Sequence, residues 1–169
     1  MSRKIIAVVL AAVILLHTQA ATVRAQGRNY YYLEWMNEKF GIHYYMADWE
    51  FKLMCYTVYC EAGNQSEEAQ RLCALVILNR VGSKKYPSTI KQVIYEKNGS
   101  QFNVVRKPGF PEAYPYNDKT EMAVYRAIAE YPLETEKLLA FRSGYHFSWG
   151  VPYEHKPEHG DMYFTIIPD

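Results

Sequence analysis

The sequence predicts an α+β domain that is mostly helical, with a small antiparallel β element near the C-terminus. Two consecutive stretches, Trp49–Ala62 and Glu67–Val81, repeat apolar residues at helical spacing and are separated by a short turn. A third stretch, Asp118–Glu130, shows the same spacing, and from residue 140 onward apolar and polar residues alternate as they do in short strands. Once the first 25 of the 169 residues are set aside as a leader, 144 remain, which fits one domain with its own core.

The N-terminus has the pattern of a cleaved export signal over residues 1–25. Basic residues at positions 3 and 4 precede a run of 12 apolar residues, Ile5–Leu16, and a region of small residues ends at Ala25. Cleavage is expected after Ala25, with Ala20 as the alternative site. The apolar run is shorter than the about 20 residues that cross a membrane, so an uncleaved anchor is the minor alternative. Residues 26–47 are an aromatic extension with a short helix expected around 33–40, and residues 48–169 form the main domain.

The charge of the mature chain argues against nucleic acid as a partner. Removing residues 1–25 takes away three of the 19 basic residues and no acidic residue, which leaves 16 against 18 and a net charge of −2. The remaining lysines and arginines form no basic stripe along a predicted element, as nucleic-acid binding would require. The pairs at 84–85 and 106–107 are most simply exposed charge.

The first predicted helix begins at Asp48, whose side chain can cap a helix over Trp49–Ala62. Gly63 is a natural end for this helix. The inward face is expected to carry Trp49, Leu53, Tyr56 and Cys60.

The second predicted helix, Glu67–Val81, is capped by Ser66 alone or by Asn64 together with Glu67. Its C-terminal half, residues 72–78, is apolar on all sides and therefore belongs in the middle of the domain. Residues 89–95 are interpreted as a short helix or strand. Residues 97–116 are rich in Gly and Pro and read as a long loop, which is either functional or contains short strands.

The third predicted helix, Asp118–Glu130, is capped by Asn117 or Asp118. Its inward residues are expected to be Met122, Tyr125, Ile128 and Ala129. Short strands are expected at Ala140–Ser143, Tyr145–Phe147 and Met162–Ile166.

Glu61 is the candidate catalytic residue because of its place at the end of the first predicted helix. An apolar stretch leads into it, and a carboxylate at a helix C-terminus faces the unfavourable end of the helix dipole. Its helical neighbours include no cation. These conditions raise the pKa of a carboxyl group and favour the protonated form that general acid catalysis needs. The alternative, a surface glutamate at a frayed helix end, stays open on local sequence alone.

Cys55, Cys60 and Cys73 are an odd number of cysteines for an exported chain. The first two are five residues apart on one predicted helix, which places their Cα atoms about 8–9 Å apart, beyond the reach of a disulfide. Cys73 can pair with one of them only if the two helices pack together. The favoured interpretation is three buried thiols that act as small hydrophobic residues.

Several segments together look like the signature of one known family. Tyr59–Ala62, Gln70 and the run Val-Ile-Leu-Asn-Arg-Val at 76–81 resemble the SleB/CwlJ-type cell wall hydrolases, the spore cortex-lytic enzymes of germination and their relatives. Residues 86–95 and 101–103 are similar to the family's next block, while the C-terminal part fits loosely. The resemblance covers residues 49–164 and is specific from 61 to 103.

The resemblance implies a lysozyme-like fold and a secreted or wall-associated enzyme that degrades peptidoglycan. Relatives cleave the bond between N-acetylmuramic acid and N-acetylglucosamine, several as lytic transglycosylases with a single glutamate. Carried over, Glu61 protonates the glycosidic oxygen and then acts as base on the muramoyl 6-hydroxyl, which gives a 1,6-anhydro sugar. This scheme differs from the usual pair of carboxylates and needs no cofactor. Spore cortex and vegetative wall both stay open as substrates.

Candidate substrate-binding residues fall into two groups. Gln101 and Phe102 line the sugar groove by resemblance, or else they anchor a loop with Phe102 buried. The aromatic, Gly-containing segment that follows the first C-terminal strand is suited to stacking on sugar rings, or else it is core and turn. Its candidates are Tyr145, His146, Trp149 and Tyr153. Two polar residues of the second helix are expected to give structural support: Gln70, and Asn79, which we expect to hydrogen-bond backbone near the Glu61 turn.

The chain departs from the family pattern near the catalytic residue. Relatives commonly carry Arg-Gly-Glu after Glu-Ala, and here Gln65 stands where they have the second acid. Asn103 replaces a usual serine, and Met162 replaces a frequent histidine. Two alternatives follow: a true hydrolase whose water is positioned by another acid, or a catalytically silent wall-binding module. The candidate acids are Glu68, Glu96 and Asp161.

His155 and His159 are four residues apart, as in some zinc sites on helices, but Pro157 between them disfavours a helix. No CxxC or paired histidine set completes a zinc site, so no metal is expected and a metallopeptidase is the most distant alternative. The expected partners are peptidoglycan glycan strands and an accessory wall or spore protein, with the chain itself a monomer.

Overall fold

The computed structural model describes residues 30–32, 45–96, 102–131 and 137–167, and the chain divides into two units, residues 1–48 and 49–169. The predicted export signal and the helix expected around 33–40 lie outside the described residues. In the first unit, β1 (Tyr30–Tyr32) pairs with β2 (Tyr45–Ala47) in an antiparallel ladder. Within the described part of the chain, no helix is both long and apolar enough to cross a membrane.

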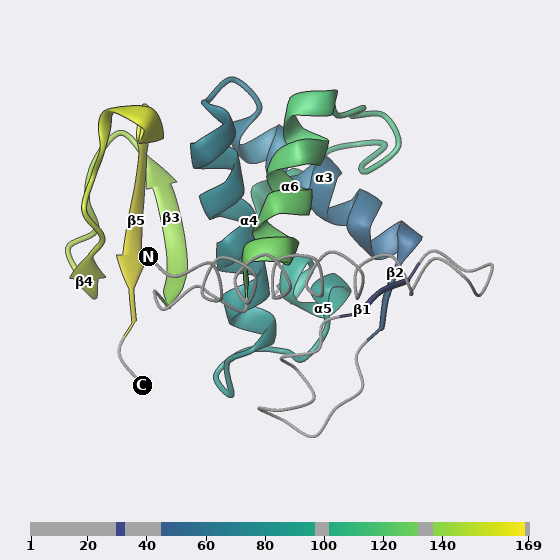
Figure 1. The fold of residues 1–169 in the computed structure, drawn as a ribbon, viewed down its shortest axis with the longest axis horizontal. Coiled ribbons are helices and arrows are strands. Elements are labelled where there is room, and N and C mark those ends of the chain that lie inside the picture. Colours follow the sequence, from purple (N-terminus) through teal and green to yellow (C-terminus); the bar gives the residue numbers. More distant parts are fainter. Residues whose placement is uncertain (1–29, 33–44, 97–101, 132–136, 168–169) are drawn as a thin grey trace, which may run out of the picture. The chain divides into compact units, whose positions relative to one another are not determined.

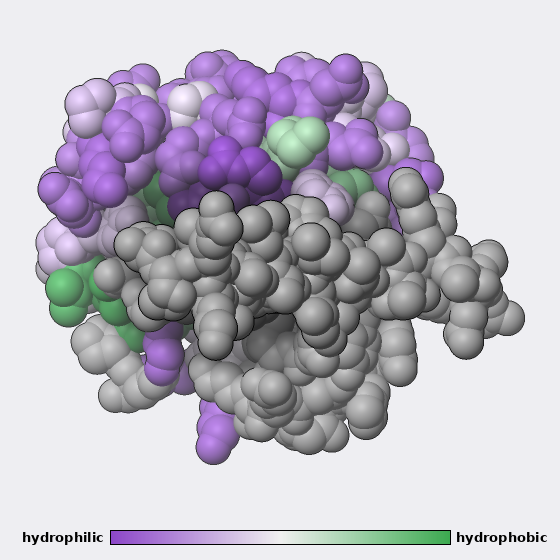
Figure 2. Space-filling view, viewed as in Figure 1, coloured by the Kyte–Doolittle hydropathy of each residue, from purple (hydrophilic) through white to green (hydrophobic). Residues whose placement is uncertain are grey.

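The second unit is built around the helix α4 (Glu67–Val81), as its all-round apolar pattern predicts. Every residue from 69 to 81 is buried, and Ser66 caps the helix by accepting a hydrogen bond from the Ala69 amide at 3.0 Å. Figure 1 shows the α6 helix (Asp118–Glu130) on one side of α4 and the strands on the other, and α4 contacts both as well as α5 (Ile90–Ile94). The surface over α4 and α6 that is visible in Figure 2 is mainly hydrophilic.

The helix α3 (Asp48–Ala62) runs into α4 through the turn at residues 63–66. Its range matches the prediction, but its predicted inward face is partly wrong, because Trp49 is 52% exposed. The buried side chains follow an adjacent stripe of the same helix instead: Glu50, Phe51, Leu53, Met54, Cys55, Thr57, Val58 and Ala62. All three cysteines are free thiols, as predicted, but only Cys55 and Cys73 are buried, and Cys60 is half-buried. Removal from solvent raises the pKa of each thiol.

The helix α6 is also rotated about its axis from the prediction. Met122 and Tyr125 are exposed, while the buried residues are Thr120, Ala123, Val124 and Ala127. The buried stripe is therefore made of small residues, which lets α6 approach α4 closely. Asn117 caps α6, since its side chain accepts from the Thr120 amide at 3.0 Å. The long loop before this helix contains the 3-10 helix η3 (Asn103–Arg106).

The C-terminal sheet has the strand order β3-β5-β4 and is antiparallel throughout. Its strands are β3 (Leu138–Ser143), β4 (Val151–Pro152) and β5 (Met162–Ile166), with the 3-10 helix η5 (Pro157–His159) between the last two. The strand predicted at Tyr145–Phe147 is wrong; this segment is part of the β3–β4 connection. The predicted α+β class, mostly helical with a small antiparallel element near the C-terminus, is confirmed.

Two polar side chains near the end of α4 hold the first strand of this sheet. Asn79 donates to the Leu138 carbonyl at 2.9 Å, and Arg80 donates through Nε to the Leu139 carbonyl at 2.7 Å. The prediction that Asn79 bonds near the Glu61 turn is therefore wrong. Because a buried amide must find a partner, Asn79 satisfies the irregular start of β3, where the register shifts.

Candidate active site

Glu61 is the second-last residue of α3, where the sequence places it, and its side chain is half-buried. The Gly63 amide makes a last helical bond to the Tyr59 carbonyl at 2.8 Å, and the chain then turns. Gly63 fits so tightly that a Cβ on it would overlap the Tyr59 carbonyl oxygen and lie 2.8 Å from the Tyr59 ring. The position two residues after Glu61 therefore requires glycine.

The environment of Glu61 raises the pKa of its carboxyl group. Burial is the largest cause, and it is opposed by a hydrogen bond from the Val104 backbone and by the positive charge of Lys107. Both opposing groups come from η3 and the residue that follows it, and local sequence around Glu61 gives no sign of either. A carboxyl group whose pKa is raised by burial, with a donor and a cation close to its ionised form, is suited to giving up a proton and taking one back.

The turn after Glu61 is held by side chains from two other helices. Gln70, buried in α4, donates to the carbonyls of Gly63 at 3.4 Å and Gln65 at 3.1 Å, which gives it a supporting position at the turn. Lys119, at the start of α6, donates to the same two carbonyls at 3.3 and 2.8 Å. The Thr120 hydroxyl donates to the Gln70 side-chain oxygen at 2.6 Å and so orients the amide.

The same turn also binds the loop before β5. Gln65, which stands where relatives carry a second acid, accepts from the Asp161 amide through Oε1 at 3.2 Å. Gly160 lies against this oxygen with φ of 56°, where a Cβ would overlap it. Ser66 donates its hydroxyl hydrogen to the Glu158 carbonyl. The amide at position 65 therefore serves as a structural link between the turn and η5.

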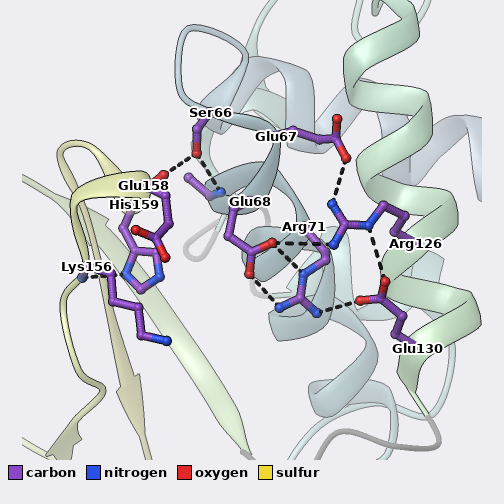
Figure 3. Close-up of polar contacts among 10 residues, drawn as sticks. Ser66, Glu67, Glu68, Arg71, Arg126, Glu130, Lys156, Glu158 and His159 are labelled. Carbon is purple, nitrogen blue, oxygen red and sulfur yellow. Dashed lines mark hydrogen bonds and ion pairs between the residues drawn. The ribbon is translucent and has the colours of Figure 1, made fainter.

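Glu68 is committed to an ion-pair network between α4 and α6 (Figure 3). Its carboxylate binds Arg71 at 2.6 and 2.9 Å and lies 3.8 Å from Arg126, and the Arg71 side chain holds the pKa of this carboxyl below its usual value. Arg126 and Arg71 also reach Glu130, at 3.2 Å each. An acid with this many cationic partners is poorly suited to activating a water molecule beside Glu61.

The two other candidate second acids also have different surroundings. The charge of Glu96 acts on the Arg80 guanidinium, which is buried near the end of α4. Asp161 is exposed, and its backbone is the part that contacts the turn. Among the described residues, the charged side chain that acts on Glu61 is Lys107.

The predicted substrate-binding residues separate into buried and exposed ones. Phe102 is only 1% exposed and packs between the Arg80 guanidinium, 5.5 Å from its ring centre, and the Phe141 ring at 6.0 Å. Phe102 is therefore buried, as the alternative in which it anchors the loop predicts. Gln101 lies outside the described residues.

The aromatic segment after β3 projects from the sheet. Tyr145 is 61% and Trp149 49% exposed. The guanidinium of Arg142 stacks over the Tyr145 ring at 3.6 Å, and Phe147 contacts Trp149 with ring centres 4.6 Å apart. These contacts hold two broad rings at the surface instead of burying them.

The remaining candidates, His146 and Tyr153, pack against rings of β5 and η5. His146 lies edge-on to Tyr163 at 4.6 Å, and Tyr153 stacks on His159 at 5.9 Å. His159 is buried, which lowers the pKa of its imidazole, and its Nδ1 accepts from the Lys156 amide at 3.1 Å. Within the described residues, no three or more His, Cys, Asp or Glu side chains are grouped so that they could hold a metal ion.

Glu61 should make the stability of the protein depend on pH. Since burial raises its pKa in the fold, its stabilising contribution is present below the unfolded pKa of about 4.3 and is lost as the pH rises through the folded pKa. The amide of the Glu61→Gln variant stays neutral at every pH. We therefore expect the melting temperature of this variant to rise relative to that of the wild type as the pH increases above the unfolded pKa of about 4.3. Parallel melting profiles for the two proteins across this range would contradict the buried environment.

This chain is similar to a known protein family and to a solved structure. The model of a family described as cell wall hydrolase matches residues 64–165, starting just after the candidate acid. A solved structure, the catalytic domain of the germination-specific lytic transglycosylase SleB from Bacillus anthracis, is similar at 25% sequence identity with a TM-score of 0.57. The alignment covers 70% of this chain and 95% of that one. A comparison with curated proteins gave no match.

Proposed function

Because the chain belongs to the SleB/CwlJ-type cell wall hydrolase family, with its lysozyme-like fold, we propose that it is a lytic transglycosylase that uses Glu61 as its catalytic acid and base. Degradation of peptidoglycan follows from the family. The bond that we propose it cleaves is the one between N-acetylmuramic acid and N-acetylglucosamine. The observation that carries it is the half-buried Glu61, whose pKa is raised and which meets the Val104 amide and the charge of Lys107.

The proposed reaction uses one carboxyl group twice, first as acid and then as base. Protonated Glu61 gives its proton to the glycosidic oxygen as the bond from that oxygen to the muramoyl C1 breaks, and positive charge develops on the sugar ring. The Val104 amide and Lys107 stabilise the carboxylate that results. Glu61 then takes the proton of the muramoyl 6-hydroxyl as its oxygen bonds to C1. The products are a 1,6-anhydromuramoyl end and a free N-acetylglucosamine hydroxyl, with no water consumed.

The surroundings of the other acids favour this scheme over hydrolysis. A hydrolase with an inverting or retaining pair of carboxylates needs a second acid within about 5–9.5 Å of the first. Glu68 is held by two arginines, Glu96 acts on Arg80, and position 65 carries an amide that binds the backbone of Asp161. An attacking group carried by the substrate itself removes the need for such a residue.

The products distinguish these possibilities directly. Purified vegetative peptidoglycan and spore cortex are digested in parallel with the mature protein and with Glu61→Gln, and the soluble muropeptides are weighed by mass spectrometry. Anhydro ends, about 18 Da lighter than hydrated reducing ends, are expected from the wild type. Hydrated ends would establish a hydrolase instead. Wall binding without soluble products from either substrate would establish a binding module.

Tyr145 and Trp149 are proposed to stack on the sugar rings of the glycan strand, with His146 and Tyr153 contributing from the neighbouring ring cluster. The exposure of Tyr145 and Trp149 supports this proposal. Arg142 packs against the first ring and Phe147 against the second. Flat apolar faces with a polar edge suit the faces of pyranose rings.

Replacing Trp149 with Ala in the inactive Glu61→Gln background should weaken binding to insoluble peptidoglycan about tenfold, since burying a large ring contributes about 1.5 kcal/mol. Co-sedimentation with purified walls measures this change. Tyr125→Ala is the matched control, because Tyr125 is 47% exposed but lies on α6. Equal binding by the two variants would remove Trp149 from the proposed surface.

The site of action is proposed to be outside the cytoplasmic membrane, with residues 1–25 as the export signal. Peptidoglycan lies there, which supports this location. An accessory wall or spore protein and a monomeric state remain predictions.

A further inference from the structure

We propose that Lys119 is a positioning residue for the reaction of Glu61, an inference that rests on the proposed function. Lys119 is exposed at the start of α6, and nothing in its local sequence suggests a role in catalysis. Its ammonium nonetheless reaches the turn that follows Glu61, where it donates to the Gln65 carbonyl at 2.8 Å and the Gly63 carbonyl at 3.3 Å.

The turn needs donors at this place because it follows the C-terminus of α3. The last carbonyl groups of a helix lack partners within the helix, and the helix dipole makes that end negative. The last turn of α3 contains no basic residue that could compensate. Lys119 supplies the missing positive charge from a helix that is distant in sequence, and so it stabilises the turn conformation at both of its bonded carbonyls.

The position of Lys119 is itself fixed by neighbouring contacts. Asn117 caps α6, and its side-chain oxygen also lies 3.0 Å from the Thr120 hydroxyl oxygen. That hydroxyl donates at 2.6 Å to Gln70, whose amide donates to the same two carbonyls that Lys119 binds. Two side chains therefore hydrogen-bond the turn, the buried Gln70 and the exposed Lys119. Both are positioned by the N-terminal end of α6.

Lys119 acts on Glu61 through the backbone of the turn. The interactions that the structure describes for the Glu61 carboxyl are with Val104 and Lys107, and Lys119 is not among them. Gly63 is two residues from Glu61 and its amide closes the helix on Tyr59, so a shift of the Gly63 carbonyl moves the last turn of α3. A displacement of about 1 Å at a catalytic group can lower a rate up to about 100-fold.

Kinetics on soluble, uncrosslinked glycan strands test this role. We expect Lys119→Met to lower kcat about tenfold with KM unchanged, and Lys119→Arg, which keeps the charge and the donors, to stay within about threefold of the wild type. Lys84→Met is the control, because Lys84 is an exposed lysine in the segment after α4. An unchanged kcat, an effect confined to KM, or an arginine variant as slow as the methionine variant would overturn the proposal.

Hydrogen exchange tests, independently of activity, whether Lys119 stabilises the turn. The amides of Gly63 and Gln65 bond to the Tyr59 and Ala62 carbonyls at 2.8 and 2.9 Å. Both should exchange faster in Lys119→Met and be protected again in Lys119→Arg. Unchanged exchange in Lys119→Met would overturn the proposal. A wild-type protein that releases no product from any wall would overturn the proposed function, and the exchange data would still show whether Lys119 holds the turn.

Discussion

Replacing Glu61 with Gln is expected to lower the release of soluble glycan fragments from peptidoglycan at least about 100-fold, because the amide cannot supply or accept the proton that the reaction needs. The substitution keeps the size and shape of the side chain and removes only its titratable proton. The fold should therefore survive, and binding to insoluble walls should match that of the wild type. Fragment release is followed by chromatography of the soluble fraction.

Glu121→Gln is the matched control for this experiment. Glu121 is an exposed glutamate on α6, and its replacement makes the same chemical change away from the proposed acid. It should leave fragment release within about twofold of the wild type, as exposed substitutions usually have small effects. Full activity in Glu61→Gln would eliminate Glu61 as the acid and leave the binding module as the better interpretation.

Replacing Gly63 with Ala should produce the second large effect, a fall in activity of about 10- to 100-fold from one added methyl group. That methyl would overlap the Tyr59 carbonyl oxygen and press on the Tyr59 ring, so the end of α3 must shift and take Glu61 with it. The change is measured as the initial rate of fragment release, with melting temperature recorded in parallel to separate displacement of the site from loss of folded protein.

Asn64→Ala is the control for the turn. Asn64 is exposed in the same turn, and its side chain accepts only a 3.3 Å bond from Gln65 in the described contacts. Its truncation adds no atom to the packed side of the turn. If Gly63→Ala were as active as Asn64→Ala, the close contact with Tyr59 would not be what positions Glu61.

The sequence located the helices well because their ends carry local signals. Ser66 and Asn117 cap α4 and α6 through their own side chains, and Gly63 ends α3. The orientation of each helix about its axis was harder to predict. On α6 the large residues Met122 and Tyr125 were expected to be inward, but the stripe that is buried consists of the smaller residues Thr120, Ala123, Val124 and Ala127.

The position of Glu61 could be predicted, but its partners could not. The residues around it indicate its burial and its place at a helix end. Val104 and Lys107 act on its carboxyl group, and Lys119 acts on the turn that follows it, from segments that are distant in sequence. Lys107 belongs to a basic pair that reads as ordinary exposed charge. Phe102 shows the opposite case, since the resemblance suggested a groove and the packing of Arg80 and Phe141 placed the ring in the core.

The strand order of the sheet determines the order in which parts of the fold can form during synthesis. β5 is the last described strand and lies between β3 and β4, so neither of the earlier strands has its partner until residues 162–166 have left the ribosome. The loop that binds Gln65 and Ser66 precedes β5 directly and is fastened at the same stage. Helices α3, α4 and α6 can pack beforehand, but the turn beside Glu61 acquires its full set of contacts only near the end of translation.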